Sequence, residues 1–204
     1  MQYCSYGFSN CYVLGTDIED DSSARDAVMV DPGSMEIALL DFIESQDYKL
    51  RGILITHDHL NHVHGLRTLK RIYDVKIFAV NPMVQGHKTR VIRDGDVIKL
   101  GAISVNVITV PGHSSDSAVF RINKTLLTGD TLTAGLLGTT ISSYGTTKQM
   151  DGLRSKVLSL PGNYVVLPGH GPPSTLNAER KNNAGIQSYE ENKNKRPRFH
   201  VEFD

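Results

Sequence analysis

Three histidines fall within six residues directly after a short apolar run, and this arrangement constrains the fold more than any other feature. The run, residues 52–55, is short and rich in β-branched side chains, which predicts a buried strand of a parallel sheet. His57, His59 and His62 follow at the point where the strand opens into a loop and then a helix. In open α/β sheets, ligand sites are built at this edge.

The spacing of these histidines indicates a metal site. His57 and His59 project the same way from an extended segment, because side chains alternate with a period of two. His62 comes around on the first turn of the following helix. A single histidine is more often a structural residue than a ligand. Imidazole nitrogens that converge on one point, however, suit zinc, iron, nickel or copper.

The same stretch carries a family resemblance. The pattern His57-x-His59-x-Asn61-His62 resembles the His-x-His-x-Asp-His signature of the metallo-β-lactamase superfamily, with Asn61 where the family has Asp. Further ligands implied by the resemblance occur in the family's order, each after an apolar run and among glycines: His113, Asp130 and His170. Within the superfamily the chain resembles the glyoxalase II-like (hydroxyacylglutathione hydrolase-like) thioester hydrolases, through its Val-Asp-Pro-Gly, Pro-Gly-His-Ser and Pro-Gly-His-Gly phrases.

Hydrophobic periodicity predicts the α/β class, and the resemblance implies the αββα four-layer sandwich of the family. Strands are expected at residues 11–15, 27–30, 49–55, 75–80, 103–110, 117–122, 125–127 and 164–167, and helices at 35–45, 61–72 and 150–160. Ser34 and Asn61 are the expected N-caps of the first two helices. Residues 94–96, Asp-Gly-Asp, predict a hairpin turn between Val91 and Leu100, and Asn123-Lys124 is expected to join residues 117–122 and 125–127 in a second hairpin. Residues 17–25 are polar and predict a surface loop.

The length of 204 residues suits one α/β domain with a short appendage. The resemblance covers about residues 10–180, so residues 1–180 are expected to form the metal-dependent hydrolase domain. Residues 181–204 are polar and rich in Lys, Asn and Glu, and they predict a solvated C-terminal tail.

The composition gives no reason to expect a nucleic acid or a membrane as a partner. Lys plus Arg equals Asp plus Glu at 22 each, which gives no reason to expect a nucleic-acid partner. No apolar stretch reaches the length of a membrane span, and residues 1–10 show no secretory signal. Cys4 and Cys11 are too few for a disulfide framework, and two thiols favour a reducing compartment. We therefore expect a cytoplasmic protein that acts on a small molecule, while the oligomeric state stays undetermined.

The resemblance implies a role for each candidate residue. The family divides its ligands between two ions: His57, His59 and His113 hold the first, His62, His170 and the residue at position 61 hold the second, and Asp130 bridges both. Asp130 and Asn61 are the expected catalytic residues. The implied cofactor is one or two divalent metal ions, zinc first, with iron or manganese as alternatives. Two such ions can share a hydroxide and polarise the substrate's carbonyl oxygen.

Asn61 leaves two alternatives open. A neutral amide oxygen is a weaker ligand for zinc or iron than a carboxylate. Either the second site is weak, or both ions bind and only the rate suffers. The sequence also leaves open that Asn61 is an introduced substitution. Asp58 alternates away from the ligand histidines and is expected to support them from outside. His64 could stand at the pocket rim in place of the lost carboxylate, or be a solvated helix residue.

Three functions compete at this stage. The first is a metal-dependent hydrolase for a thioester or related ester, without the C-terminal helical domain that holds glutathione in glyoxalase II. The second is a mononuclear iron dioxygenase for persulfides, which resembles this motif set and would use His57, His113 and Asp130. The third is a metal-binding domain that the change at Asn61 has weakened or disabled.

Overall fold

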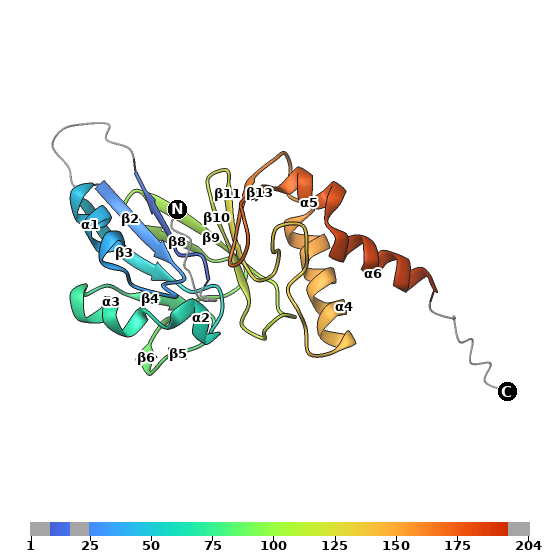
Figure 1. Ribbon diagram of the computed structural model, residues 1–204, viewed down its shortest axis with the longest axis horizontal. Coiled ribbons are helices and arrows are strands. Elements are labelled where there is room, and N and C mark those ends of the chain that lie inside the picture. The colour runs from blue at the N-terminus through green and yellow to red at the C-terminus, as the bar shows by residue number, and fades with distance from the viewer. Residues whose placement is uncertain (1–8, 17–24, 196–204) are drawn as a thin grey trace.

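The computed structural model describes residues 9–16 and 25–195 (Figure 1). Cys4, most of the predicted loop at 17–25, and residues 196–204 of the predicted tail lie outside the described residues. Cys11 is buried and packs in the core, as a small apolar side chain does. Among the described helices, none is long and apolar enough to cross a lipid bilayer.

Two sheets pack face to face, and helices cover their outer faces (Figure 1). The first sheet has the order β1 (Tyr12–Gly15), β2 (Arg25–Val30), β3 (Tyr48–Leu54), β4 (Ile77–Ala79) and β7 (Arg90–Val91). The second has the order β13 (Ser174–Thr175), β12 (Val165–Pro168), β11 (Thr125–Gly129), β10 (Ala118–Ile122), β9 (Ile103–Thr109) and β8 (Val97–Leu100). A separate two-stranded hairpin consists of β5 (Met83–Val84) and β6 (His87–Lys88).

The helices complete the four layers. On the first sheet's side lie α1 (Ile37–Ser45), α2 (Leu60–Val63) and α3 (Leu66–Ile72), and on the second sheet's side lie α4 (Ser143–Gly152), the π-helical turn η1 (Leu153–Val157), α5 (Leu176–Asn182) and α6 (Ala184–Lys195) (Figure 1). This arrangement confirms the αββα sandwich.

Side-chain alternation in the strands explains why the sheets can be covered on both faces. In β3, Ile53 packs in the cluster under the helices, while the next residue, Leu54, packs in the cluster between the sheets. In β10, Phe120 faces the other sheet and Val119 faces the second helical layer. A strand buried on both faces reads as a continuous apolar run, as the sequence does here.

Parallel pairing places the strand ends that carry the candidate residues at one edge. Strands β2, β3 and β4 pair in parallel in the first sheet, and β11 pairs in parallel with β12 in the second. Their carboxyl ends therefore open side by side, and the loops that follow them meet between the two sheets.

The prediction of a hairpin at residues 94–96 is wrong. Val91 ends β7 in the first sheet, whereas Leu100 ends β8 in the second sheet. The turn, with Gly95 at φ 82°, carries the chain from one sheet to the other. Local turn chemistry was recognised correctly, but the sequence does not say which sheet each flanking strand joins. The hairpin through Asn123, which lies at φ 51° between β10 and β11, is confirmed.

Helix ends also differ from the prediction. The first helix begins at Ile37 with Glu36 at its N-cap, so Ser34 is not the cap. Asn61 lies inside α2, and the predicted helix 61–72 is divided at Gly65. The helix predicted from residue 150 already begins at Ser143, because the Ser142 hydroxyl accepts a hydrogen bond from the backbone N–H of Gly145.

The segment predicted as a polar tail begins as helix. The boundary predicted at residue 180 falls inside α5, and α6 extends to Lys195. Leu176, before the boundary, is buried in the second helical cluster, and Ile186 and Tyr189, after it, pack against the same cluster. These apolar residues tie at least the first part of the segment to the domain.

Candidate metal centre

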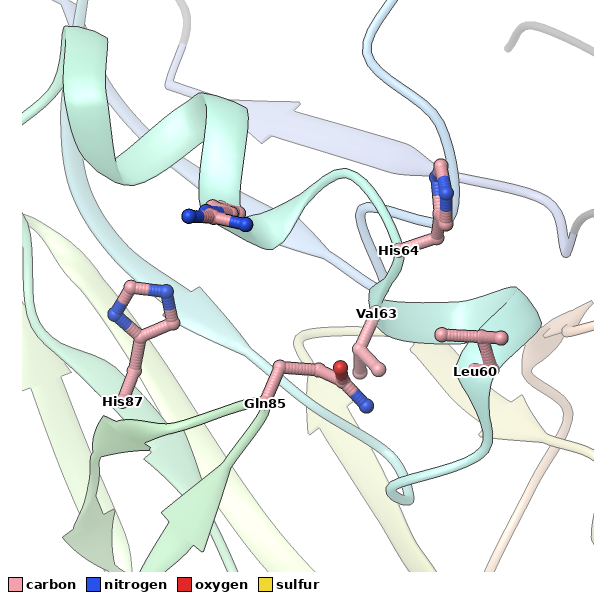
Figure 2. A pocket seen from close by; sticks show the side chains of 6 residues that line it. Leu60, Val63, His64, Gln85 and His87 are labelled. Carbon is pink, nitrogen blue, oxygen red and sulfur yellow. The ribbon is translucent and has the colours of Figure 1, made fainter.

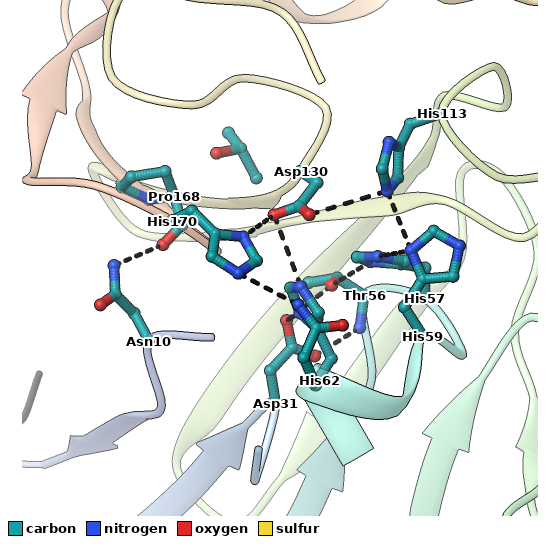
Figure 3. A network of polar contacts seen from close by, with 12 residues as sticks. Asn10, Asp31, Thr56, His57, His59, His62, His113, Asp130, Pro168 and His170 are labelled. Atoms are coloured by element: carbon teal, nitrogen blue, oxygen red, sulfur yellow. Dashed lines mark hydrogen bonds and ion pairs between the residues drawn. The ribbon is translucent and has the colours of Figure 1, made fainter. Parts of the chain in front are cut away.

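The candidate residues lie in loops at the carboxyl ends of four strands and meet in one place (Figure 3). His57 and His59 follow β3, and His62 lies in the short helix α2 behind them. The remaining three follow strands of the second sheet: His113 after β9, Asp130 after β11 and His170 after β12. Both sheets therefore contribute to the site.

Three imidazole nitrogens form the first group. The Nε2 of His57 lies 2.9 Å from the Nδ1 of His59, which lies 3.1 Å from the Nε2 of His113. These three residues form a candidate ligand group. Nitrogens bound at about 2.0 Å to a tetrahedral zinc ion stand roughly 3.3 Å apart. The observed spacing fits a divalent ion held by three imidazoles.

A second group shares His57 and adds His62 and Asp130. Asp130 faces both groups, with its Oδ1 3.4 Å from the Nε2 of His62 and its Oδ2 3.7 Å from the Nε2 of His113. The Nε2 of His62 is buried and has no hydrogen-bond partner among the described residues. A buried ring nitrogen that is aimed at a carboxylate without a hydrogen bond fits a site for a cation. The residues present thus fit a metal ion.

Outer hydrogen bonds fix the far side of these rings. His113 Nδ1 donates to the backbone carbonyl of Thr139 at 2.7 Å, and His57 Nδ1 donates to the Thr56 hydroxyl at 3.1 Å. His62 Nδ1 lies 2.9 Å from the Oδ2 of Asp31. Each of these bonds places a proton on Nδ1, so Nε2 is the ring nitrogen that faces the site.

Asp31 is the residue that the sequence analysis missed as part of the site. It lies in the Val-Asp-Pro-Gly phrase directly after β2, with a φ of 50°. It is also buried, and its carboxylate accepts bonds from the Thr56 backbone N–H (2.8 Å), the Thr56 hydroxyl (2.6 Å) and His62. The available signal was its place at the carboxyl end of β2, the same sheet edge as the histidines.

Charges in the site differ sharply between neighbours. Burial, and repulsion from His62, lower the pKa of His57 to about 2, so this ring is neutral at any ordinary pH. Burial also opposes the charging of His62, but Asp31 and Asp130 outweigh it and raise its pKa to about 9. Burial disfavours the Asp130 carboxylate, yet a hydrogen bond from His170 and the positive charge of His62 nearby hold its pKa well below the usual range. Asp130 is therefore an anion between the two groups.

His170 and Asn61 pair with each other. The Nε2 of His170 lies 3.0 Å from the Nδ2 of Asn61, and its Nδ1 lies 2.7 Å from the Oδ1 of Asp130. Both ring nitrogens of His170 thus have partners within the protein, and His170 belongs to neither ligand group. The structure brings Asn61, Asp130 and His170 together as the resemblance implies. Their roles as ligands stay predictions.

The two residues expected to lie outside the ligand shell take different positions. The backbone N–H of Asp58 donates to Asp116, which also accepts bonds from Asn81 and Ser114. Burial, and repulsion from Asp116, raise the pKa of Asp58, which belongs to neither ligand group. His64 is exposed and lines a separate cavity, beside the β5–β6 hairpin (Figure 2). It too lies outside both ligand groups.

Close packing explains one glycine of the site. A Cβ atom on Gly169, which precedes His170, would lie 2.4 Å from Asp130 Oδ1 and 2.5 Å from His62 Cε1. Any larger residue would displace one of the two side chains. Gly169 of the Pro-Gly-His phrase therefore leaves room for the side chains of Asp130 and His62, next to His170 in the chain.

Comparisons with known proteins decide the family. A model of the metallo-beta-lactamase superfamily matches residues 5–84. An uncharacterised protein of Mycobacterium tuberculosis is 31% identical over 87% of this chain and 92% of its own length. The chain belongs to the metallo-β-lactamase superfamily. This superfamily member is also 26% identical to the hydroxyacylglutathione hydrolase GloC of Haemophilus influenzae, over 88% of this chain and 93% of that one. These likenesses make it glyoxalase II-like within the superfamily.

Solved structures show the same fold. The ETHE1 protein of Myxococcus xanthus matches with a TM-score of 0.77 at 22% identity, covering 93% of this chain and 88% of its own. The BLEG-1 B3 metallo-beta-lactamase matches with a TM-score of 0.76 at 23% identity, covering 87% and 94%. At these identities the likeness shows the architecture, and the superfamily relation indicates a hydrolase.

Proposed function

We propose that this protein is a binuclear metal-dependent hydrolase that cleaves a thioester or a related ester of a small molecule. One observation carries the proposal: Asp130 directs one carboxylate oxygen toward His62 and the other toward His113, so the two ligand groups meet at a single anion. Two divalent ions bound there would supply an activated water and polarise the substrate's carbonyl oxygen. Zinc fits the imidazole-rich first group, and iron or manganese would also suit the set.

The protein's own residues prepare the site. Asp31 and Thr56 hold the rings of His57 and His62 with their Nε2 atoms facing inward. The carbonyl of Thr139 does the same for His113, and so ties the loop after Asp130 to the centre. These contacts fix the rings before substrate arrives, so little reorganisation is needed during the reaction.

Hydrolysis of a thioester forms a bond between the carbonyl carbon and the water oxygen and breaks the bond from carbon to sulfur. The products are a carboxylic acid and a thiol. The hydroxyacylglutathione hydrolase name of the H. influenzae relative, which matches nearly the full length of both chains, supports a thioester as the first substrate to assay.

The test combines turnover with elemental analysis. We expect two divalent ions per chain and hydrolysis of at least one member of a panel of glutathione and other thioesters. His113→Ala should lose one ion and reduce kcat/KM by at least about a hundredfold, because it removes a ligand of the first group. A matched control, His87→Ala, removes a histidine outside both ligand groups and should keep both ions.

Two results would contradict the proposal. One is a single iron per chain with oxygen uptake in the presence of a persulfide, which is the dioxygenase alternative. The other is metal binding without turnover on any thioester or phosphodiester, which would leave a metal-binding domain.

A further inference from the structure

Two cavities lie along α3 and the β5–β6 hairpin and are not explained by the metal centre. The first, of about 460 Å³, is lined by Leu60, Arg67 and His87 among others (Figure 2). The second, of about 530 Å³, is lined by residues of α3, β4, β6 and β7. His87 lines both, so the two cavities are neighbours. We call them together the α3 groove.

One end of the α3 groove reaches the metal-binding loop. Leu60, which lines the first cavity, directly follows His59 in the sequence and begins α2. Val63 of the same helix lines the same cavity, next to His62 in the chain (Figure 2). A ligand that lies in the groove would therefore extend away from the loop that carries the candidate ligands.

Positive charge gathers in the α3 groove, although the chain has no net charge. Its cations are Arg67, Lys70, Lys76, Lys88 and Arg90, and Asp74 is the only carboxylate that lines it within the described residues. Lys70 is accounted for locally, because its Nζ donates to the Val75 carbonyl at 2.6 Å and lies 3.6 Å from Asp74.

The other four cations of the groove have, among the described residues, no ion pair of the kind that Lys70 forms with Asp74. Arg67, Lys76, Lys88 and Arg90 are exposed, and none forms an ion pair with a residue in the part of the chain that the structure describes. Arg67 comes from α3 and Lys88 from β6, whereas Lys76 precedes β4 and Arg90 begins β7. Cations around a cavity of this size suit an anion with several phosphate groups, because one guanidinium group can donate two parallel hydrogen bonds to two oxygens of a phosphate.

We propose that the α3 groove binds the phosphate-bearing carrier of the thioester substrate, a nucleotide-linked thiol of the coenzyme A class. This inference rests on the proposed thioesterase function and names its substrate class. The carrier's phosphates lie among Arg67, Lys88 and Arg90, and its uncharged arm runs past Leu60 toward the metal-binding loop. The groove thus selects the thiol half of the substrate, while the metal centre acts on the carbonyl.

The experiment measures carrier binding separately from hydrolysis. Calorimetry on the metal-loaded full chain uses 3′-phosphoadenosine 5′-diphosphate, which has the phosphates but no thioester. The groove variant is Arg67→Gln/Lys88→Gln/Arg90→Gln. The control, Lys49→Gln/Lys99→Gln/Lys181→Gln, removes the same charge from exposed lysines outside both cavities. We expect the groove variant to bind at least about tenfold more weakly, the control to bind like the unaltered protein, and salt to weaken binding.

Several outcomes would overturn the inference, and they differ from a failure of the proposed function. If the unaltered protein does not bind the nucleotide but still hydrolyses thioesters, the groove proposal is rejected and the proposed thioesterase function is not. Equal weakening in both variants rejects it in favour of general charge attraction. Tighter binding of a single-stranded RNA, lost in the groove variant, assigns the groove to nucleic acid instead. Carrier binding without hydrolysis of any thioester supports the groove as an anion site and rejects the thioesterase function.

Discussion

Replacing Asp31 with alanine should destabilise the metal-free protein strongly, because this buried carboxylate accepts three hydrogen bonds. Two come from Thr56, at 2.8 and 2.6 Å, and one from His62 at 2.9 Å. Each buried donor left without an acceptor costs about 1–3 kcal/mol, so for three donors we expect a loss of roughly 3–9 kcal/mol in the free energy of unfolding. That is a large part of the stability of an ordinary domain.

Asp47→Ala is a matched control for this change. Asp47 is also an aspartate in the left-handed region, with φ 52° against 50° for Asp31, but its side chain is exposed. Both substitutions place alanine in an unfavourable backbone conformation, which costs about 1–2 kcal/mol. The difference between them therefore isolates the buried hydrogen bonds. Urea unfolding after chelation measures both, and equal losses for the two variants would refute the reasoning.

The same experiment has a pH dependence of known sign. Asp31 and Asp130 raise the pKa of His62 to about 9 from 6.5, so charged His62 stabilises the folded state. This contribution is fully present below pH 6.5 and is lost as the pH rises through 9. The deficit of Asp31→Ala relative to the unaltered protein should therefore shrink between pH 6 and pH 10. A deficit that grows over this range would mean that the Asp31–His62 pair is not ionic.

Three further predictions concern the metal site, the surface and the core. Asn61→Asp should raise the affinity for a second divalent ion about tenfold or more, since a carboxylate replaces a neutral amide beside His170, and chelator competition measures it. Asp94→Asn should cost under about 1 kcal/mol at pH 7, because the Asp94–Lys156 pair (3.0 Å) is half-exposed. Burial raises the pKa of Asp94, but Lys156 and Thr109 outweigh it, so the pKa is lowered in the folded state. The difference in unfolding free energy between Asp94→Asn and the unaltered protein should therefore vanish as the pH falls through this lowered pKa. Phe120→Ala should cost about 3–5 kcal/mol in urea unfolding, because Phe120 is fully buried between the sheets.

Much of the fold could be predicted from local patterns. Strands β2, β3 and β10 read as apolar runs because each is covered on both faces, and this property belongs to the strand itself. The hairpin through Asn123 could also be predicted, because its two strands are adjacent in the sequence and pair with each other. The place of the turn at residues 94–96 could not be predicted, because the same turn sequence can join two strands of one sheet or pass between sheets.

The sequence by itself determined the candidate ligands, since their residue types and their spacing of a few positions decide what chemistry they offer. Only the tertiary structure decided which atoms support them. Asp31 lies 25 residues from Thr56 and 31 from His62, and the partner of Asn61 is His170, 109 positions away. Hydrogen bonds over such separations exist only after the sheets have packed, because parallel pairing and the sandwich bring the strand ends to one edge. No local pattern encodes them.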